Sequence, residues 1–350
     1  MKSTVLRCEY VWLDGNQTQQ IRSKTRVLSL NSDDEDWSLS LSDVPVWSFD
    51  GSSTNQAGSK SSDLILRPVF ACIDSNRENG VIVLCDVLNE DMTPHSTNQR
   101  AKLIQAFADH ASSSPFIGFE QEYFFVEGGN VLGWPESGES PQPQGSYYCG
   151  VGAENVAGRN LSELHLTSCI NSGLSIVGVN AEVALGQWEY QIGGTNVNMI
   201  EACDHLWVSR FILQRLCELQ GVGVTFDPKP IDGDWNGSGM HANFSTKTMR
   251  GPGGIHLIEN ACEALGSDSA IERAHQSYGE GLDRRLTGDH ETCSMSEFRY
   301  GVGDRTASIR IPASVSRYGF GYLEDRRPNS NADPYAVARV LSDVICPMDL

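Results

Sequence analysis

The sequence predicts an α+β protein in which a small β-rich domain precedes a larger domain of mixed helices and strands. Residues 1–90 contain short strand-like segments separated by polar turns rich in glycine and serine. Amphipathic helices follow, most clearly at residues 204–221, where apolar side chains recur at helical spacing and Gly221 suits a C-terminal cap. We therefore expect one domain at residues 1–95 and a second at residues 96–350.

Each element is predicted by its local pattern. Four segments of the first domain are strand-like: EYVWLDG, TRVLSL, LILRPVF and VIVLCDVL. The second domain is expected to begin with a helix in QRAKLIQAFADH, capped by Ser96 or Thr97. A strand, FIGFEQEYFF, is expected at 116–125, and a long polar loop at 133–146. Further helices are expected in SDSAIERAHQSYGEGL and in PYAVARVLSDVI, where a proline suits the first turn.

Composition excludes several classes of partner. The 350 residues carry 26 basic and 45 acidic side chains, a net charge of −19, which repels nucleic acids and anionic membranes. No apolar run approaches the roughly 18 residues of a membrane span. Ten scattered cysteines without a CxxC pair are typical of reduced thiols. We expect a cytoplasmic location, with neither nucleic acid nor membrane as a partner.

Two closely spaced glutamates suggest a cation. Glu120 and Glu122 are two residues apart in an expected strand, so both side chains point to one face. Two like charges so close repel each other unless a cation lies between them. The alternative is a solvated strand edge, and the flanking apolar residues FIGF and YFF argue against it.

A second pair of glutamates stands in the apolar segment NAEVALGQWEYQIGGTNV. Glu182 and Glu189 are seven apart, which would place them on opposite faces of one unbroken strand. Gly186 lies between them and can make a turn or a bulge. After it, Gln187, Glu189 and Gln191 share one face. This polar stripe fits a lined cavity, and it fits the solvent face of a β-hairpin equally well.

Basic residues complete the pattern. His241 lies in the glycine-rich stretch GDWNGSGMHANFST, where it is either a ligand or an ordinary buried histidine. After Lys247 all basic side chains other than histidine are arginines. Arginine binds carboxylates and phosphates bidentately, which suits anionic ligands. Compositional drift is the alternative explanation for the absence of lysine. No P-loop or GxGxxG motif is present. Together these residues favour Mg²⁺ or Mn²⁺ held by carboxylates and bridging nucleotide phosphates, with phosphoryl transfer as the chemistry.

In this order, the motifs resemble glutamine synthetase in the shorter form found in eukaryotes and some bacteria. The matching stretches span nearly the whole chain: VWLDG, RSKTR, WSFDGSSTNQAGSKSSDLILRP, GFEQEYFF, QGSYYCGVG, NAEVALGQWEYQIG, FDPKPIDGDWNGSGMHANFST, RLTGDHET, DRTASIRIP and YLEDRRPNSNADPY. The resemblance implies a β-grasp-like N-terminal domain, followed by a catalytic domain with a curved antiparallel sheet and flanking helices.

It also implies an activity. Glutamate would attack ATP to give γ-glutamyl phosphate, and ammonia would then displace phosphate to give L-glutamine, with two or three Mg²⁺ or Mn²⁺ ions per site. L-glutamate, ammonium and ATP are the expected substrates, and two stacked pentameric rings the expected homo-oligomer. Two alternatives are a ligase of the same fold that uses another amine and a non-catalytic structural relative.

The resemblance assigns roles to individual residues. One metal would be held by Glu122, Glu182 and Glu189, and the second by Glu120, His241 and Glu324. Glutamate would bind at Asn236, Gly237, Arg285 and Arg326. ATP would contact Glu189, Asn243, Ser245, Tyr322 and Glu324, with the catalytic Arg305 and Arg310 on its phosphates. Ammonium would bind at Asp50, Ser53 and Tyr148, with Asp50 as the proton acceptor and part of a neighbouring subunit's site. Glu291 would lie on a flap that shields the intermediate.

One departure from the family pattern concerns the phosphate-binding region. The chain has Gly303 and Asp304 where the family often has alanine and asparagine. Asp304 stands directly before Arg305. We expect it either to weaken the hold of that arginine on phosphate or to orient the guanidinium.

Overall fold

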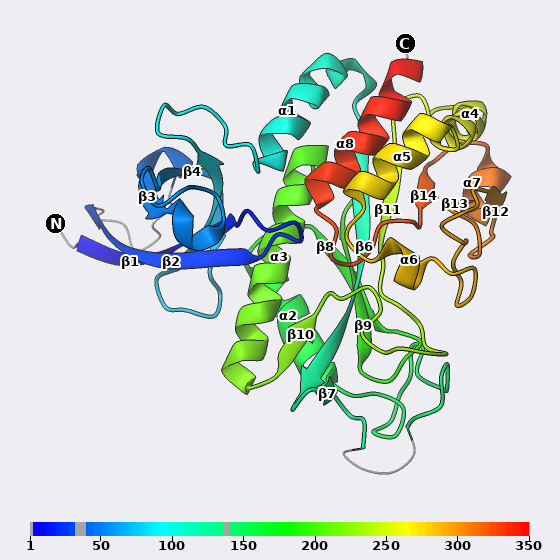
Figure 1. The fold of residues 1–350 in the computed structure, drawn as a ribbon, viewed down its shortest axis with the longest axis horizontal. Helices are drawn as coiled ribbons and strands as arrows, with labels where there is room; N and C mark the ends of the chain where they lie inside the picture. The colour runs from blue at the N-terminus through cyan, green and yellow to red at the C-terminus, as the bar shows by residue number, and fades with distance from the viewer. Residues whose placement is uncertain (1–2, 32–39, 136–139, 350) are drawn as a thin grey trace. The chain divides into compact units, whose positions relative to one another are not determined.

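A computed structural model of the chain describes residues 3–31, 40–135 and 140–349 (Figure 1). It confirms the predicted α+β class. The chain divides into two compact units, one made of residues 1–102 with 167–174 and the other of residues 103–166 with 175–350. The boundary that we expected after residue 95 stays a prediction. Part of the expected surface loop, at 136–139, lies outside the described residues.

The first unit is built on a five-stranded sheet in the order β2-β1-β5-β4-β3. Its strands are β1 (Ser3–Leu13), β2 (Ile21–Asn31), β3 (Trp47–Asp50), β4 (Asp63–Ile73) and β5 (Gly80–Leu88). β1 and β5 run parallel, and the other pairs are antiparallel. The four predicted strands are confirmed. β3 was missed because it has only four residues, and the short helix η2 (Gly51–Thr54) follows it at once.

The second unit carries a nine-stranded sheet, whose main path is β12-β13-β14-β11-β6-β9-β8. The strands are β6 (Phe116–Glu127), β7 (Asn130–Val131), β8 (Ile176–Ala181), β9 (Gln187–Gly193), β10 (Gly223–Thr225), β11 (Met240–Ser245), β12 (Tyr300–Val302), β13 (Ile309–Ile311) and β14 (Leu323–Asp325). β12 and β13 are parallel, and the remaining pairs are antiparallel. The strand predicted at 116–125 is the central strand β6.

The helices begin and end close to their sequence signals. They are α1 (Gln99–Asp109), α2 (Arg159–Asn171), α3 (Met199–Gln220), α4 (Ile255–Leu265), α5 (Asp268–Ser277), α6 (Leu282–Arg285), α7 (Ala313–Tyr318) and α8 (Pro334–Ile345), with 3-10 turns at η1 (Leu41–Asp43), η3 (Ala111–Ser113) and η4 (Cys346–Met348). The expected cap of α1 by Ser96 or Thr97 is wrong. The Asn98 side chain accepts a hydrogen bond from the Ala101 N–H at 2.9 Å, directly before the helix.

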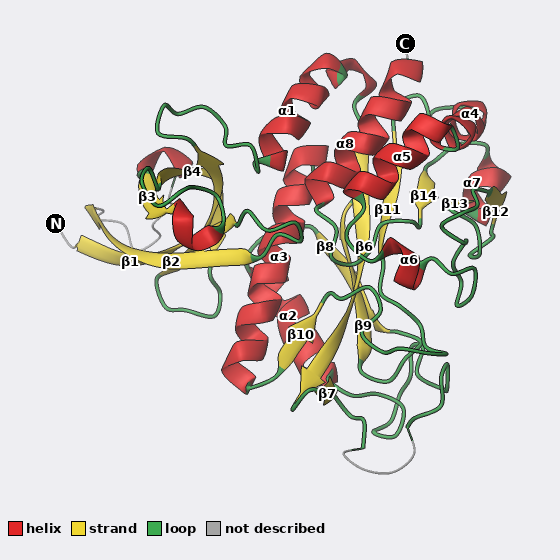
Figure 2. Cartoon of the chain, in the orientation of Figure 1, coloured by secondary structure: helices red, strands yellow, loops and turns green. Residues whose placement is uncertain are grey.

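Helices cover one face of the larger sheet. Helix α3 packs against β6, β9 and β10, and α8 packs against β11 and α3, as Figure 2 shows for the red helices beside the yellow strands. Trp188, Tyr190 and Ile192 of β9 are buried. On the same strand, Glu189 alternates with them and therefore points to the opposite face of the sheet.

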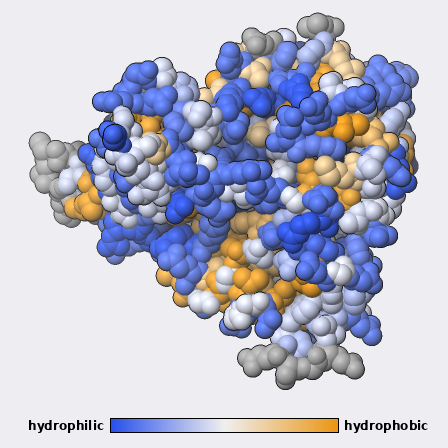
Figure 3. All heavy atoms as spheres, viewed as in Figure 1, coloured by the Kyte–Doolittle hydropathy of each residue, from blue (hydrophilic) through white to orange (hydrophobic). Residues whose placement is uncertain are grey.

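Two further properties concern the surface and the thiols. Hydrophilic residues cover most of the face drawn in Figure 3, as expected for a chain with a net charge of −19. All ten cysteines carry free thiols. Within the described residues, no helix combines the length and the apolar character that a membrane span needs.

Gly186 closes the turn between β8 and β9. Its φ is +84°, and a Cβ atom there would lie 2.6 Å from the Leu132 carbonyl oxygen. Because Glu182 follows β8 and Glu189 lies within β9, this turn brings the two glutamates to neighbouring strands. The turn interpretation of the glycine is confirmed.

Gly186→Ala is therefore expected to destabilise the fold by about 2–4 kcal/mol, because left-handed backbone strain adds to a steric clash. Chemical unfolding measures the loss. Gly173→Ala is the matched control, since Gly173 has φ +75° and open space around its Cβ position, so only the strain of about 1 kcal/mol applies. Equal losses in both variants would contradict the clash.

Candidate active site

Five of the six predicted metal ligands lie on neighbouring strands in register, and Glu182 lies in the turn directly after β8. Glu122 of β6 stands opposite Glu189 of β9, and Glu120 stands opposite His241 of β11. Glu324 of β14 stands opposite a residue of β11 two positions beyond His241. Residues directly opposite in a sheet point to the same face, as do residues two apart in one strand. All five side chains therefore share the face that α3 and α8 leave uncovered.

Three of these residues form a compact donor group. One ligand atom from each of Glu120, Glu189 and His241 lies within 4.8 Å of the others. His241 Nδ1 is also 3.6 Å from Glu324 Oε1, and His241 Nε2 is 4.0 Å from Glu122 Oε1. Carboxylate oxygens with one imidazole fit Mg²⁺ or Mn²⁺. The group draws on both expected triads, so the division into two metal sites stays a prediction.

Burial sets the protonation of these ligands. It raises the pKa of Glu189 well above its ordinary value, and repulsion from Glu182 and Glu120 raises it further. Burial and the charge of Glu122 raise the pKa of Glu182 to about 8. Burial lowers the pKa of His241 well below its ordinary value. The imidazole is therefore neutral and keeps a lone pair, while the carboxylates require a nearby positive charge to ionise.

Two arginine side chains neutralise the charge of Glu324. Arg310 Nη1 donates to Glu324 Oε2 at 2.5 Å, and Arg326 Nη1 donates to Glu324 Oε1 at 2.6 Å. The Glu324 side chain is almost completely buried, so an uncompensated carboxylate there would be costly. The structure thus pairs Glu324, an expected metal ligand, with two arginines. The resemblance assigned these arginines to anionic substrates, Arg310 to the phosphates of ATP and Arg326 to glutamate.

Arg285 lies beside His241. Its Nη2 atom is 3.3 Å from His241 Nε2 and donates to the Arg326 carbonyl oxygen at 3.1 Å. A Cβ atom at Gly239 would lie 2.3 Å from Arg285 Nη2, and one at Gly237 would lie 2.9 Å from Arg285 Cγ. These two glycines of the glycine-rich stretch thus make room for the Arg285 side chain.

The loop before β11 is anchored by residues that sequence reasoning missed. Asn236 accepts a hydrogen bond from Gln144 Nε2 at 2.9 Å, and its neighbour Trp235 packs on Trp134 with 4.5 Å between ring centroids. The Trp134 indole in turn donates to the Leu185 carbonyl oxygen. Gln144 and Trp134 come from the segment that looked like an unspecific polar loop, and the aromatic residue in it was the available signal.

Three predicted nucleotide contacts meet at one pocket. Asn243, Ser245 and Tyr322 line a cavity of about 380 Å³, together with the GGTN stretch at 193–196. Sequence reasoning missed that stretch. It also missed Arg250, whose Nη1 atom donates to both the backbone and the side-chain oxygen of Ser245.

Arg305 and Asp304 lie at the rim of the site. The Arg305 side chain is exposed, while its carbonyl oxygen accepts a hydrogen bond from Arg326 Nε at 3.1 Å. Asp304 Oδ1 accepts from the backbone N–H and the hydroxyl of Thr306 at 2.8 and 2.7 Å. Asp304 therefore shapes the turn that presents Arg305.

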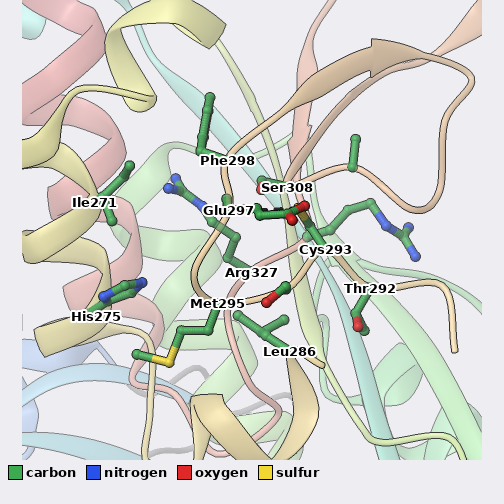
Figure 4. Close-up of a pocket in the computed structure, with 13 residues that line it drawn as sticks. Ile271, His275, Leu286, Thr292, Cys293, Met295, Glu297, Phe298, Ser308 and Arg327 are labelled. Carbon is green, nitrogen blue, oxygen red and sulfur yellow. Dashed lines mark hydrogen bonds between the residues drawn. The ribbon is translucent and has the colours of Figure 1, made fainter. Parts of the chain in front are cut away.

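Glu291 and Tyr148 border the two pairs of glutamates. The charge of Glu291 is one cause of the raised pKa of Glu182. Burial raises the pKa of Tyr148, and the charges of Glu182 and Glu189 add to it. Glu291 belongs to residues 286–295, which we call the flap segment. A small cavity of about 20 Å³ lies under its base (Figure 4).

Two of the expected ammonium-binding residues, Asp50 and Ser53, belong to the first unit. Asp50 accepts hydrogen bonds from the Ser52 backbone N–H at 3.0 Å and from the Ser53 hydroxyl at 2.8 Å. Hydrogen bonds from the Ser52 and Ser53 hydroxyls lower the pKa of Asp50 to about 2. Asp50 is therefore an exposed, ionised carboxylate at neutral pH.

Comparison with protein families covers both halves of the chain. Residues 4–90 match the model of the beta-Grasp domain of glutamine synthetase. Residues 95–253 match the model of the glutamine synthetase catalytic domain.

Individual relatives match over nearly the full length. A glutamine synthetase of Streptomyces viridochromogenes is 49% identical over 342 residues, covering 97% of this chain and 96% of the relative. A chloroplastic glutamine synthetase of Chlamydomonas reinhardtii is 49% identical, covering 96% of this chain and 89% of the relative. A glutamine synthetase of Saccharomyces cerevisiae is 46% identical, covering 97% of this chain and 88% of the relative.

Proposed function

The chain belongs to the glutamine synthetase family and is a glutamate–ammonia ligase, and from this premise we propose that it makes L-glutamine through γ-glutamyl phosphate, with ATP as the co-substrate. One observation carries the proposal most directly. Carboxylates and one neutral imidazole lie on adjacent strands and share one face, where Arg310 stands opposite the buried Glu324. That face has the charges needed to hold an anionic substrate beside a cation.

The proposed metal ligands are Glu120, Glu122, Glu182, Glu189, His241 and Glu324. Their fit to a divalent cation rests on the donor group of Glu120, Glu189 and His241 and on the cost of ionising buried carboxylates without one. A bound Mg²⁺ or Mn²⁺ would neutralise charge on the phosphoryl group during its transfer.

The remaining residues would bind and orient the substrates. We propose that Arg285 and Arg326, with Asn236 and Gly237, hold glutamate. Arg305 and Arg310 would lie on the phosphates, and the pocket of Asn243, Ser245 and Tyr322 would take the nucleotide, since about 380 Å³ is in the range of ligand pockets. Glu291 would keep water from the acyl phosphate.

We also propose the ammonium site and the assembly. Asp50 stays ionised because its pKa is about 2, which suits cation binding, and Ser53 and Tyr148 would complete the site. Asp50 would then accept the proton as ammonia attacks the activated carbonyl. We propose that Asp50 serves the site of a neighbouring subunit in a homo-oligomer of two stacked pentameric rings, and that the enzyme is cytoplasmic.

The test is glutamine formation by the purified chain with glutamate, ATP, Mg²⁺ and ammonium, followed by chromatography together with phosphate release. We expect glutamine and phosphate in equal amounts. Absence of both would contradict the proposal and favour a non-catalytic relative. Product with methylamine or putrescine but not with ammonium would favour a ligase for another amine. Negative-stain imaging of the same sample checks the rings.

A further inference from the structure

The tip of the flap segment has an unfavourable backbone. His290 and Glu291 follow each other with φ values of +50° and +60°. Side chains with a Cβ atom rarely adopt this left-handed conformation, and contacts must hold two such residues in a row. The tip also carries Glu291, whose charge is one cause of the raised pKa of Glu182.

The base of the flap segment is firmly held. The Met295 N–H donates to the Leu286 carbonyl oxygen at 2.9 Å and closes the segment at its base. Leu286, Thr292, Cys293 and Met295 line the small cavity drawn in Figure 4, and Leu286, Thr292 and Cys293 are buried. These contacts hold the base of the flap segment. The position of the tip therefore depends on the contacts that the tip itself makes.

Two contacts join the tip to other parts of the site. Arg326 Nη2 donates to the Glu291 carbonyl oxygen at 3.4 Å. His290 Nε2 lies 3.0 Å from Asp234 Oδ1, an ion pair when the imidazole is protonated. The His290 side chain is mostly buried, whereas that of Asp234 is 87% exposed.

Asp234 stands on a fixed support. Its neighbour Trp235 is buried and packs on Trp134, and Asn236 is held by Gln144. The loop that carries Asp234 is therefore anchored independently of the flap segment, and it also carries a proposed glutamate-binding residue.

We propose that Asp234 is a positioning residue that holds the tip of the flap segment over the site through His290, and so keeps Glu291 in place to exclude water. The inference rests on the proposed function for its catalytic consequence and on geometry alone for the position of the tip. Water that reached the acyl phosphate would take the acyl group in place of ammonia, regenerating glutamate and releasing phosphate. Charged groups near this contact include Asp289 and Glu291 on the flap segment, Lys229 and Asp232 on the loop of Asp234, and the guanidinium groups of Arg284 and Arg326.

The test uses Asp234→Asn, which removes the charge without changing the shape of an exposed side chain. Asp232→Asn is the control, because it makes the same charge change two residues away on the same loop. Hydrogen exchange of residues 288–291 is measured by mass spectrometry on the wild type and both variants under identical conditions. We expect exchange about two- to fivefold faster in Asp234→Asn, the effect of losing one exposed ion pair, and no change in Asp232→Asn.

The same variants are then assayed for phosphate released per glutamine formed. We expect the excess of phosphate over glutamine, which measures hydrolysis of the acyl phosphate, to rise about two- to fivefold in Asp234→Asn and to return toward the wild-type value in Asp234→Glu, which restores the charge. Equal exchange in Asp234→Asn and Asp232→Asn would overturn the inference, whatever the activity. A wild-type chain that formed no glutamine would instead contradict the proposed function, and hydrogen exchange would still decide the role of Asp234.

Discussion

Glu189→Gln is expected to lower glutamine formation by at least about a hundredfold and to weaken metal binding, while the fold and the oligomer persist. The substitution keeps the shape of the side chain and removes one anionic oxygen from the donor group with Glu120 and His241. Loss of one preorganised electrostatic contact in a buried site costs about 3–4 kcal/mol of transition-state stabilisation, which corresponds to two to three decades in rate.

The measurements are turnover as a function of Mg²⁺ concentration and Mn²⁺ binding by calorimetry. Glu127→Gln, at the exposed end of the same strand as Glu120, is the matched control and should behave as the wild type. Near-normal turnover of Glu189→Gln at low Mg²⁺ would show that this side chain is not a ligand.

The same residue gives a pH dependence for the metal-free protein. Burial raises the pKa of Glu182 to about 8 and that of Glu189 well above its ordinary value. Between pH 4.5 and about 8 the folded state therefore binds more protons than the unfolded state, so the free energy of unfolding falls as pH rises. Thermal unfolding in chelator should show this decline, Mg²⁺ should reduce it, and Glu189→Gln should have a shallower one. A flat profile for the metal-free wild type would contradict the assignment.

Arg327→Met is expected to destabilise the protein by about 3–5 kcal/mol, the largest effect on stability that we predict. Arg327 makes two hydrogen bonds to Asp325, at 2.9 Å from Nε and 2.7 Å from Nη2, and the Tyr278 hydroxyl donates to the same carboxylate at 2.9 Å. Asp325 is fully buried. Without the guanidinium, the buried carboxylate keeps only neutral donors, the Tyr278 hydroxyl and the backbone N–H of residue 327 at 3.1 Å.

Thermal and urea unfolding measure the loss, which corresponds to a fall in melting temperature on the order of 10 °C. The double variant Asp325→Asn with Arg327→Met is the control, because it removes both charges. It should be more stable than Arg327→Met alone. A double variant less stable than the single one would show that the cost lies in packing rather than in an unpaired charge. The consequence reaches the site, since Asp325 and Arg327 alternate along the chain with Glu324 and Arg326.

Local signals explain which parts of the fold were predictable. Strand β6 and helix α8 follow from patterns within a dozen residues, and Asp333 and Pro334 mark the beginning of α8 as expected. The cap of α1 was misplaced by one or two positions because Ser96, Thr97 and Asn98 are all good capping residues, and only the geometry selects among them.

The site was predictable in residue type but not in arrangement. The spacing of Glu182 and Glu189 was compatible with a lined cavity and with the solvent face of a hairpin. The structure buries both, because β9 pairs with β6 on one side and β8 on the other, and such long-range pairing has no local signal. The resemblance supplied roles for the arginines. Neither source predicted that Glu324 is held by Arg310 and Arg326, because that contact depends on strands brought together by the fold.

The pairing of Glu324 with two arginines couples the ligands of this site to one another. A cation that binds Glu324 must compete with the guanidinium groups of Arg310 and Arg326. The two ion pairs therefore lower the apparent affinity of the site for the cation. An anion that draws Arg310 or Arg326 away removes that competition and strengthens cation binding. By thermodynamic linkage the cation must strengthen binding of the anion by the same factor. We therefore predict that a metal at the proposed ligands and an anionic substrate at these arginines bind cooperatively, without a change of fold.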